Sequence, residues 1–337
     1  MNKGLFIVAV FALLLVACSG CSTPPAPTQI ATFTAVAPEL APTATVFPTN
    51  PPPAPSPTSA ALPTQALTIT PTPANTPTSG PTPTLGPDDW QSLPVVPTEV
   101  SQRVLLIYQL GILKGNNPRV YSKIGDCNVT MPYFMGDFDT AGKYVLGDYA
   151  NLQDSIDYFQ GAHSRTSLAA KPGLTAHAAL SMLWVDWKQC ETYETPLTCE
   201  FRLNRPMYAI IAFGTNDASG NVDFDKALRR VVDMTIGSGV IPILATKADN
   251  AEGDNGFNRV IVNLAYEYEL PVWNYWAAVQ PLENHGLKDA EHLEHLSEGK
   301  LGLFNFTKEN LGYGWPVRNL TALQVLDAVR RAVEAAQ

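Results

Sequence analysis

Three short polar segments of this chain carry side chains that could act together on a substrate. The first is Gly125-Asp126-Cys127, which follows the strand-like run Val120–Ile124. A nucleophilic side chain on the turn after a strand lies at the rim of a sheet, where a substrate can reach it. This side chain is a thiol where a hydroxyl would be more usual. The turn therefore predicts either a hydrolase with a cysteine nucleophile or a former serine hydrolase that has lost its chemistry.

The other two segments supply an amide, a carboxylate and an imidazole. Gly214-Thr215-Asn216-Asp217 follows the apolar run Tyr208–Phe213, which is typical of a buried parallel strand. Asp289-Ala290-Glu291-His292 lies near the end of the chain. In this order, the three segments resemble the blocks of the SGNH (GDSL-type) hydrolase superfamily: a Gly-Asp-Ser turn, a Gly-x-Asn-Asp turn and Asp-x-x-His. Cys127 stands where that family has serine.

The resemblance implies a role for each residue. Cys127 would be the nucleophile, His292 would take its proton and return it to the leaving group, and Asp289 would orient the imidazole. The backbone N–H groups of Cys127 and Gly173 and the side-chain amide of Asn216 would hold the oxyanion. The carboxylates Asp126 and Asp217 are expected to brace the two turns rather than to react.

Some of these assignments have alternatives in the sequence. Gly161 could take the place of Gly173. His295 is followed by Leu and Ser, as the family's histidine often is, but it lacks an Asp three residues before it, so we choose His292. Asn216 could be only a turn residue, and Asp289 could be a helix N-cap.

The histidines near the C-terminus also raise the question of a metal. His285, Asp289, His292 and His295 do not have the spacing of a standard zinc signature, so we predict no metal here. The resemblance implies no cofactor. We expect the aromatic residues of 273–276 to lie in the core or in the wall of a pocket.

Three cysteines lie in the C-terminal part of the chain. Cys190 and Cys199 flank a polar loop, and in an oxidising compartment this spacing favours a disulfide between them. Cys127 would then be the odd thiol. It could instead be a small buried hydrophobe, or it could pair with one of the other two and block the site.

The N-terminal segment predicts export. The apolar stretch from Leu5 to Ala17 is too short to remain across a membrane. Leu15-Val16-Ala17-Cys18 resembles a bacterial lipobox, so residues 1–17 would be a lipoprotein signal peptide and Cys18 the lipidated residue. The alternatives are modification at Cys21 and an ordinary signal peptide. We expect a protein on the cell surface, anchored to the membrane by lipid.

Residues 18–97 are expected to form the lipidated Cys and a disordered linker. This segment is rich in Pro and Thr, lacks apolar periodicity and has almost no charge. In polyproline II conformation it could extend on the order of 200 Å, which would hold a domain away from the membrane.

Residues 98–337 remain for one globular domain, in which apolar strands alternate with helices. The predicted helices are Val104–Leu113, Leu180–Trp187, Phe224–Ile236, Asn258–Tyr268 and Thr321–Ala335, and the predicted strands are Val120–Ile124, Tyr208–Phe213, Val240–Ala245 and Val272–Tyr275. This order predicts an α/β fold, a three-layer sandwich with a central parallel sheet of the SGNH or flavodoxin-like kind.

The partners follow from charge and from the resemblance. A net charge of −9 with no basic stripe argues against nucleic acid. The resemblance implies an esterase that removes acyl or acetyl groups from a small molecule, a carbohydrate or an envelope polymer. The alternative is a catalytically inactive member that binds a glycan or an acylated ligand. We expect a monomer.

Overall fold

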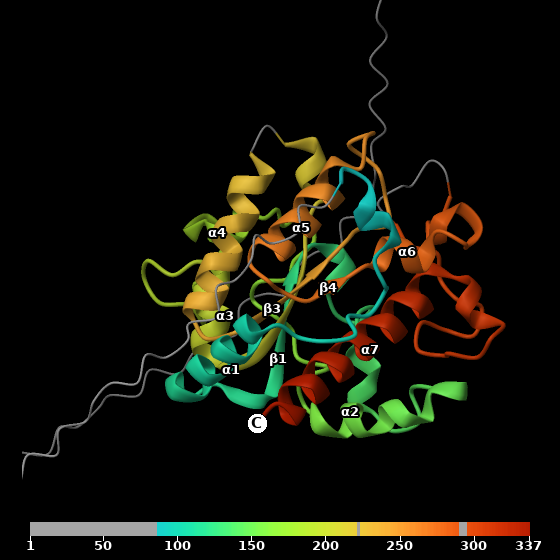
Figure 1. Ribbon diagram of the computed structural model, residues 1–337, viewed down its shortest axis with the longest axis horizontal. Coiled ribbons are helices and arrows are strands. Elements are labelled where there is room, and N and C mark those ends of the chain that lie inside the picture. The colour runs from blue at the N-terminus through green and yellow to red at the C-terminus, as the bar shows by residue number, and fades with distance from the viewer. Residues whose placement is uncertain (1–85, 221–222, 290–294) are drawn as a thin grey trace, which may run out of the picture. The chain divides into compact units, whose positions relative to one another are not determined.

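A sheet of four parallel strands forms the centre of the domain. The computed structural model describes residues 86–220, 223–289 and 295–337. The strands lie in the order β1-β2-β3-β4 (Figure 1). They are β1 Asn117–Gly125, β2 Pro206–Ala212, β3 Ile241–Ala245 and β4 Val272–Trp273. β2 and β3 are buried along their whole length, as their uninterrupted apolar runs predict.

Helices cover both faces of this sheet. They are α1 Gln102–Lys114, α2 Gln153–Tyr158, α3 Pro196–Asn204, α4 Phe224–Gly237, α5 Gly256–Glu267, α6 Tyr275–Val279 and α7 Gly314–Ala335. α4 and α5 connect successive parallel strands in one direction, so right-handed crossovers place both on the same face, where they pack together. α1 and α7 contact each other and the sheet. The predicted α/β class, with a central parallel sheet between helices, is confirmed.

One predicted helix, Leu180–Trp187, is wrong. The chain instead forms two short 3-10 turns, Ala178–Leu180 and Met182–Trp184. Ser181 separates them, because its backbone is extended and its hydroxyl accepts a hydrogen bond from Leu183 N. A serine that caps a new turn competes with a continuous helix.

Two helices begin at residues that are typical of helix N-termini, although neither start was predicted. α7 begins at Gly314, ahead of the predicted start at Thr321, and Pro316 lies in its first turn, where proline is tolerated. α3 begins after a capping box in which the Thr195 hydroxyl accepts from the backbone N–H of Thr198. Residues 191–198 were predicted only as a polar loop, and the helix begins within them at Pro196.

Residues ahead of position 98 also pack on the domain. The buried ring of Trp90 meets Trp276 edge-on at a centroid distance of 4.8 Å. Asn274 Nδ2 donates to the carbonyl oxygens of Trp90 and Leu93, each at 3.0 Å. The predicted signal peptide, Cys18 and most of the Pro/Thr-rich linker lie outside the described residues. Within the described part of the chain, no helix combines the length and apolarity needed to cross a membrane.

Candidate functional site

The turn after β1 holds Cys127 at the carboxyl edge of the sheet. Gly125 has a φ of 151°, and a Cβ there would collide with the carbonyl oxygen of Ala212 on the neighbouring strand, so only glycine fits. Asp126 Oδ1 accepts from Asn128 N at 2.9 Å and fixes the turn. Cys127 is half-buried and its thiol is free. Asp126 therefore braces this turn, as predicted.

The turn after β2 lies beside the first. Gly125 and Ala212 are register partners, so the residues that follow each strand leave the sheet at the same edge. The Asn216 Nδ2 atom is buried and has no hydrogen-bond partner among the described residues. A buried donor without an acceptor is costly and uncommon, and it points to a ligand or a reaction at that position.

Asp217 connects this second turn to the loop that carries Gly173. Its Oδ2 accepts from Gly214 N at 3.0 Å, and its Oδ1 accepts from Ala176 N at 2.9 Å. Burial raises the pKa of this carboxyl, and its two backbone hydrogen bonds oppose that shift. The predicted bracing role of Asp217 thus extends to the loop after Gly173.

The two glycine alternatives differ in whether their amides are in use. Gly161 N donates to Asp139 Oδ1 at 2.7 Å. Gly173 has a φ of 76°, and its N–H donates to no acceptor in the described parts of the chain. The N–H of Cys127 likewise donates to no backbone carbonyl there. Of the two alternatives, Gly173 is the one with an available backbone donor.

The described residues on either side of the third polar segment lie close together. Leu287 and Leu296 form an antiparallel bridge. Asp289 and His295 are described, whereas His292 lies outside the described residues. The choice between His292 and His295 as catalytic base therefore stays open.

A small cavity lies between this bridge and the nucleophile turn. Leu287 and Leu296 line it together with Asp126, Asn128 and Arg318. Its volume is about 20 Å³, which is enough for a water molecule but not for a substrate. The bridge between Leu287 and Leu296 therefore lies near the carboxyl edge of the sheet, beside the turn that carries Cys127.

Sequence reasoning missed Arg318, a buried cation beside the nucleophile turn. Its Nε donates to the carbonyl oxygen of Asn128 at 2.7 Å. Its guanidinium lies 4.7–5.3 Å from the ring centroids of Phe134, Trp273 and Tyr275. Aromatic faces stabilise a cation that is buried away from solvent. Trp273 and Tyr275 are buried, in agreement with the expectation that they line the core.

The charges around Cys127 decide the state of its thiol. Burial and the neighbouring Asp126 raise the pKa of Cys127 to about 11, and Arg318 opposes this rise. Burial likewise raises the pKa of Asp126 to about 6. The thiol is therefore protonated at neutral pH, and it needs a base to become a nucleophile.

A buried ionic cluster in the loop after β3 also supports the Asn216 turn. Lys247 Nζ pairs with Asp249 at 2.7 Å and with Glu252 at 2.5 Å. The Thr215 hydroxyl donates to Asp249 Oδ2 at 2.7 Å. This network connects the loop after β3 to the residue preceding Asn216.

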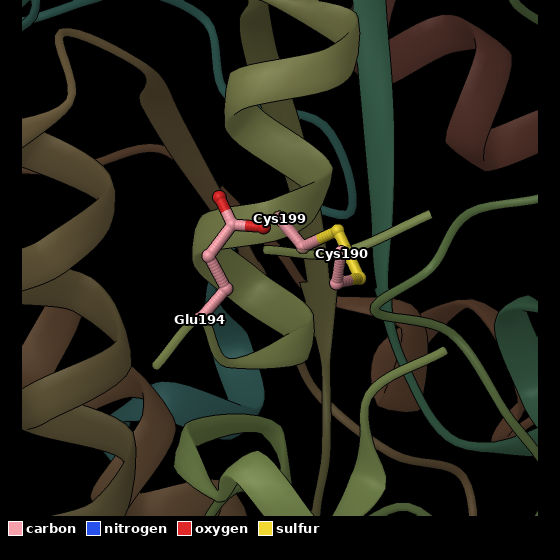
Figure 2. A group of neighbouring side chains, drawn as sticks. All are labelled: Cys190, Glu194 and Cys199. Atoms are coloured by element: carbon pink, nitrogen blue, oxygen red, sulfur yellow. A yellow bond between two sulfur atoms is a disulfide. The ribbon is translucent and has the colours of Figure 1, made fainter. Parts of the chain in front are cut away.

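Cys190 and Cys199 form the predicted disulfide. Figure 2 shows their bonded sulfurs with Glu194 nearby. The three residues are close enough to suggest a metal site, but sulfurs that are bonded to each other are not thiolate ligands. The Glu194 carboxylate instead pairs with Arg202 at 2.6 Å. Because both cysteines are paired, neither blocks Cys127.

Comparisons with known proteins add little to this description. No model of a protein family matches the chain, and no curated protein matches it. Among solved structures, a GDSL-like lipase from Bacteroides thetaiotaomicron VPI-5482 is similar. It shares 14% identity, with a TM-score of 0.36, over 69% of this chain and 100% of that chain. At these values the likeness carries no argument about function.

Proposed function

We propose that this domain is an SGNH-like ester hydrolase with Cys127 as its nucleophile. The Cys127 sulfur attacks the ester carbonyl carbon while His292, oriented by Asp289, takes the thiol proton. The C–O bond then breaks, and the imidazolium gives its proton to the departing alcohol. Water hydrolyses the thioester and releases the acid and the free thiol.

The observation that carries this proposal is the unpartnered amide of Asn216. Its Nδ2 is buried without an acceptor among the described residues, beside a turn that presents a free thiol. An oxyanion that develops during attack would supply the missing acceptor, and one such donor typically lowers the barrier by roughly 2.7–4 kcal/mol. The backbone N–H groups of Cys127 and Gly173, which donate to no backbone carbonyl of the described residues, are the other two donors in this proposal.

The substrate in this proposal is an acyl or acetyl ester on a carbohydrate or envelope polymer. The exported N-terminus, with lipid on Cys18, would hold the domain at the cell surface, where such polymers occur. This localisation rests on the sequence alone.

A specific observation favours a second candidate function. The pKa of Cys127 is raised to about 11, whereas reactive cysteines usually have a lowered pKa. A catalytically inactive protein that binds a glycan or an acylated ligand in the same cleft would tolerate such a thiol.

Hydrolysis of short p-nitrophenyl esters by the wild type, Cys127→Ala and Cys127→Ser separates the two functions. The hydrolase requires turnover by the wild type and its loss in Cys127→Ala. Asn216→Ala should reduce kcat about 100-fold with little change in KM. Activity that appears only in Cys127→Ser would show that the natural thiol marks an inactive site.

A further inference from the structure

A second and larger cavity opens beside the nucleophile turn. Val129, Thr130 and Met131, which follow Cys127 closely in the chain, form one side of it. Its volume of about 570 Å³ is in the range of small-ligand sites, unlike the water-sized cavity near Arg318. Cys127 is thus close to a cavity large enough to hold part of a substrate.

The lining of this cavity mixes polar and apolar side chains and is balanced in charge. Thr130 and Thr166 contribute hydroxyl groups to it, and Lys171 and Asp186 contribute one positive and one negative charge. Lys171 Nζ already donates to a backbone carbonyl, and Asp186 Oδ2 already accepts from Gln189 Nε2 at 2.8 Å. A lining without net charge fits an uncharged ligand rich in hydroxyl groups better than a phosphate or a carboxylate.

Two exposed tryptophans are close in sequence to Asp186, one of the residues that line the cavity. Trp184 is 40% exposed and Trp187 is 62% exposed, on either side of the segment that includes Asp186. The Trp184 carbonyl oxygen accepts the Lys171 ammonium at 2.5 Å, which ties this segment to the cavity wall. A flat, exposed indole offers an apolar face to the C–H face of a sugar ring while leaving the sugar's hydroxyls to polar neighbours.

The segment with these rings is anchored at its far end. Cys190 follows Gln189 directly, and its disulfide to Cys199 attaches it to α3. Asp186 also accepts from Lys188 N at 3.0 Å, which fixes the turn between the two indoles and the disulfide. A surface that is ordered before binding loses less entropy when a ligand binds to it.

We propose that this cavity, together with Trp184 and Trp187, binds a neutral polysaccharide and presents its ester to Cys127. The name glycan subsite is used below for these two residues with Thr130, Thr166, Asp186 and Gln189. The delivery of an ester rests on the proposed function, whereas the binding does not, because it needs no reaction at Cys127.

Affinity gel electrophoresis tests the binding. The full-length chain carries Cys18→Ser and Cys21→Ser, so that no acyl chain is attached, and Cys127→Ala, so that no ester is cleaved. The gels contain O-acetylated xylan, glucomannan or a soluble β-glucan. We expect at least one polysaccharide to retard this protein. Trp187→Ala should weaken that binding about tenfold, and Trp187→Phe should restore most of it.

Tyr193→Ala is the matched control, because Tyr193 is an exposed aromatic residue of the same region but lies beyond Cys190, whereas Trp184 and Trp187 lie on either side of Asp186, which lines the cavity. Its retardation should equal that of the parent protein. The glycan subsite is wrong if no polysaccharide retards the protein, or if Trp187→Ala and Tyr193→Ala behave alike. It is also wrong if the protein binds only to phospholipid vesicles in a parallel sedimentation assay. Binding without ester hydrolysis by the Cys127-containing protein would leave the subsite standing and remove the hydrolase.

Discussion

The Asp217 carboxylate accepts a hydrogen bond from the backbone N–H of Ala176 at 2.9 Å, although 41 residues separate the two in sequence. Its other oxygen accepts from Gly214 N, at the start of its own turn. One buried side chain therefore sets the position of the Asn216 turn and of the loop after Gly173. These are two of the three places from which the proposed oxyanion donors come.

Asp217→Ala should destabilise the domain by about 2–4 kcal/mol, because it leaves two buried N–H groups without an acceptor. Asp217→Asn keeps one acceptor oxygen and should cost about half as much. Urea denaturation measures both. Asp225→Ala, at an exposed carboxylate on α4, is the control and should change stability by less than about 0.5 kcal/mol. Equal stabilities for the Asp217 and Asp225 variants would contradict the bracing role.

Asp126 should make the domain less stable as the pH rises from about 4 to 6. Burial, partly offset by Arg318 and reinforced by Asp249 and Asp217, raises its pKa in the folded protein to about 6, above the unfolded value near 3.9. The folded state then binds more protons than the unfolded state in this window, so the free energy of unfolding falls with rising pH.

Asp126→Asn removes this titration and should flatten the profile. The unfolding free energy of the wild type relative to that of Asp126→Asn should fall by on the order of 2–3 kcal/mol between pH 4 and 7. Urea denaturation at closely spaced pH values measures the difference. A constant difference across that range would show that the Asp126 pKa is not raised in the folded protein.

The Cys127 thiol should react slowly with iodoacetamide. Because its pKa is raised to about 11, alkylation at pH 8 should be about 10- to 100-fold slower in the folded protein than in urea. Arg318→Met should slow alkylation further, because Arg318 favours the thiolate, whereas Arg318→Lys should retain the wild-type rate within a few fold. Peptide mass spectrometry follows Cys127 separately. Faster alkylation in Arg318→Met than in the wild type would reverse the assigned role.

The disulfide should stabilise the domain by about 2–3 kcal/mol, since it closes a short loop between residues 190 and 199. Replacing both cysteines by alanine should lower the denaturation midpoint, and reduction of the wild type should lower it similarly. Reductant should leave the double variant unchanged. A response of the double variant to reductant would show that its effect on the wild type has another origin.

Two of the strands were predictable because burial on both faces demands uninterrupted apolar residues. Tyr208–Phe213 and Val240–Ala245 correspond closely to β2 and β3. Cys127 and Asn216 could be placed at the same edge of the sheet because the carboxyl ends of parallel strands lie together. The short strand β4 ends at Trp273, before the predicted Tyr275, because Asn274 caps α6 through its side chain.

The features of the site that the sequence did not predict depend on tertiary contacts, which local sequence does not encode. Arg318 lies ahead of the helix predicted to start at Thr321, so nothing local placed its charge against Asn128. The elevated thiol pKa also arises from burial, which a residue type alone does not reveal. The Ser181 cap was the one local signal that could have corrected the helix predicted over Leu180–Trp187.

Detection of an acyl group on Cys127 tests the proposed hydrolysis at its first step. The full-length wild type is mixed with p-nitrophenyl acetate, quenched in acid within seconds, digested and analysed by mass spectrometry. A cysteine nucleophile predicts an acetyl thioester on the Cys127 peptide, its removal by neutral hydroxylamine and its absence from Cys127→Ala. Release of p-nitrophenol at equal rates from wild type and Cys127→Ala, with no acetyl group on Cys127, would contradict it.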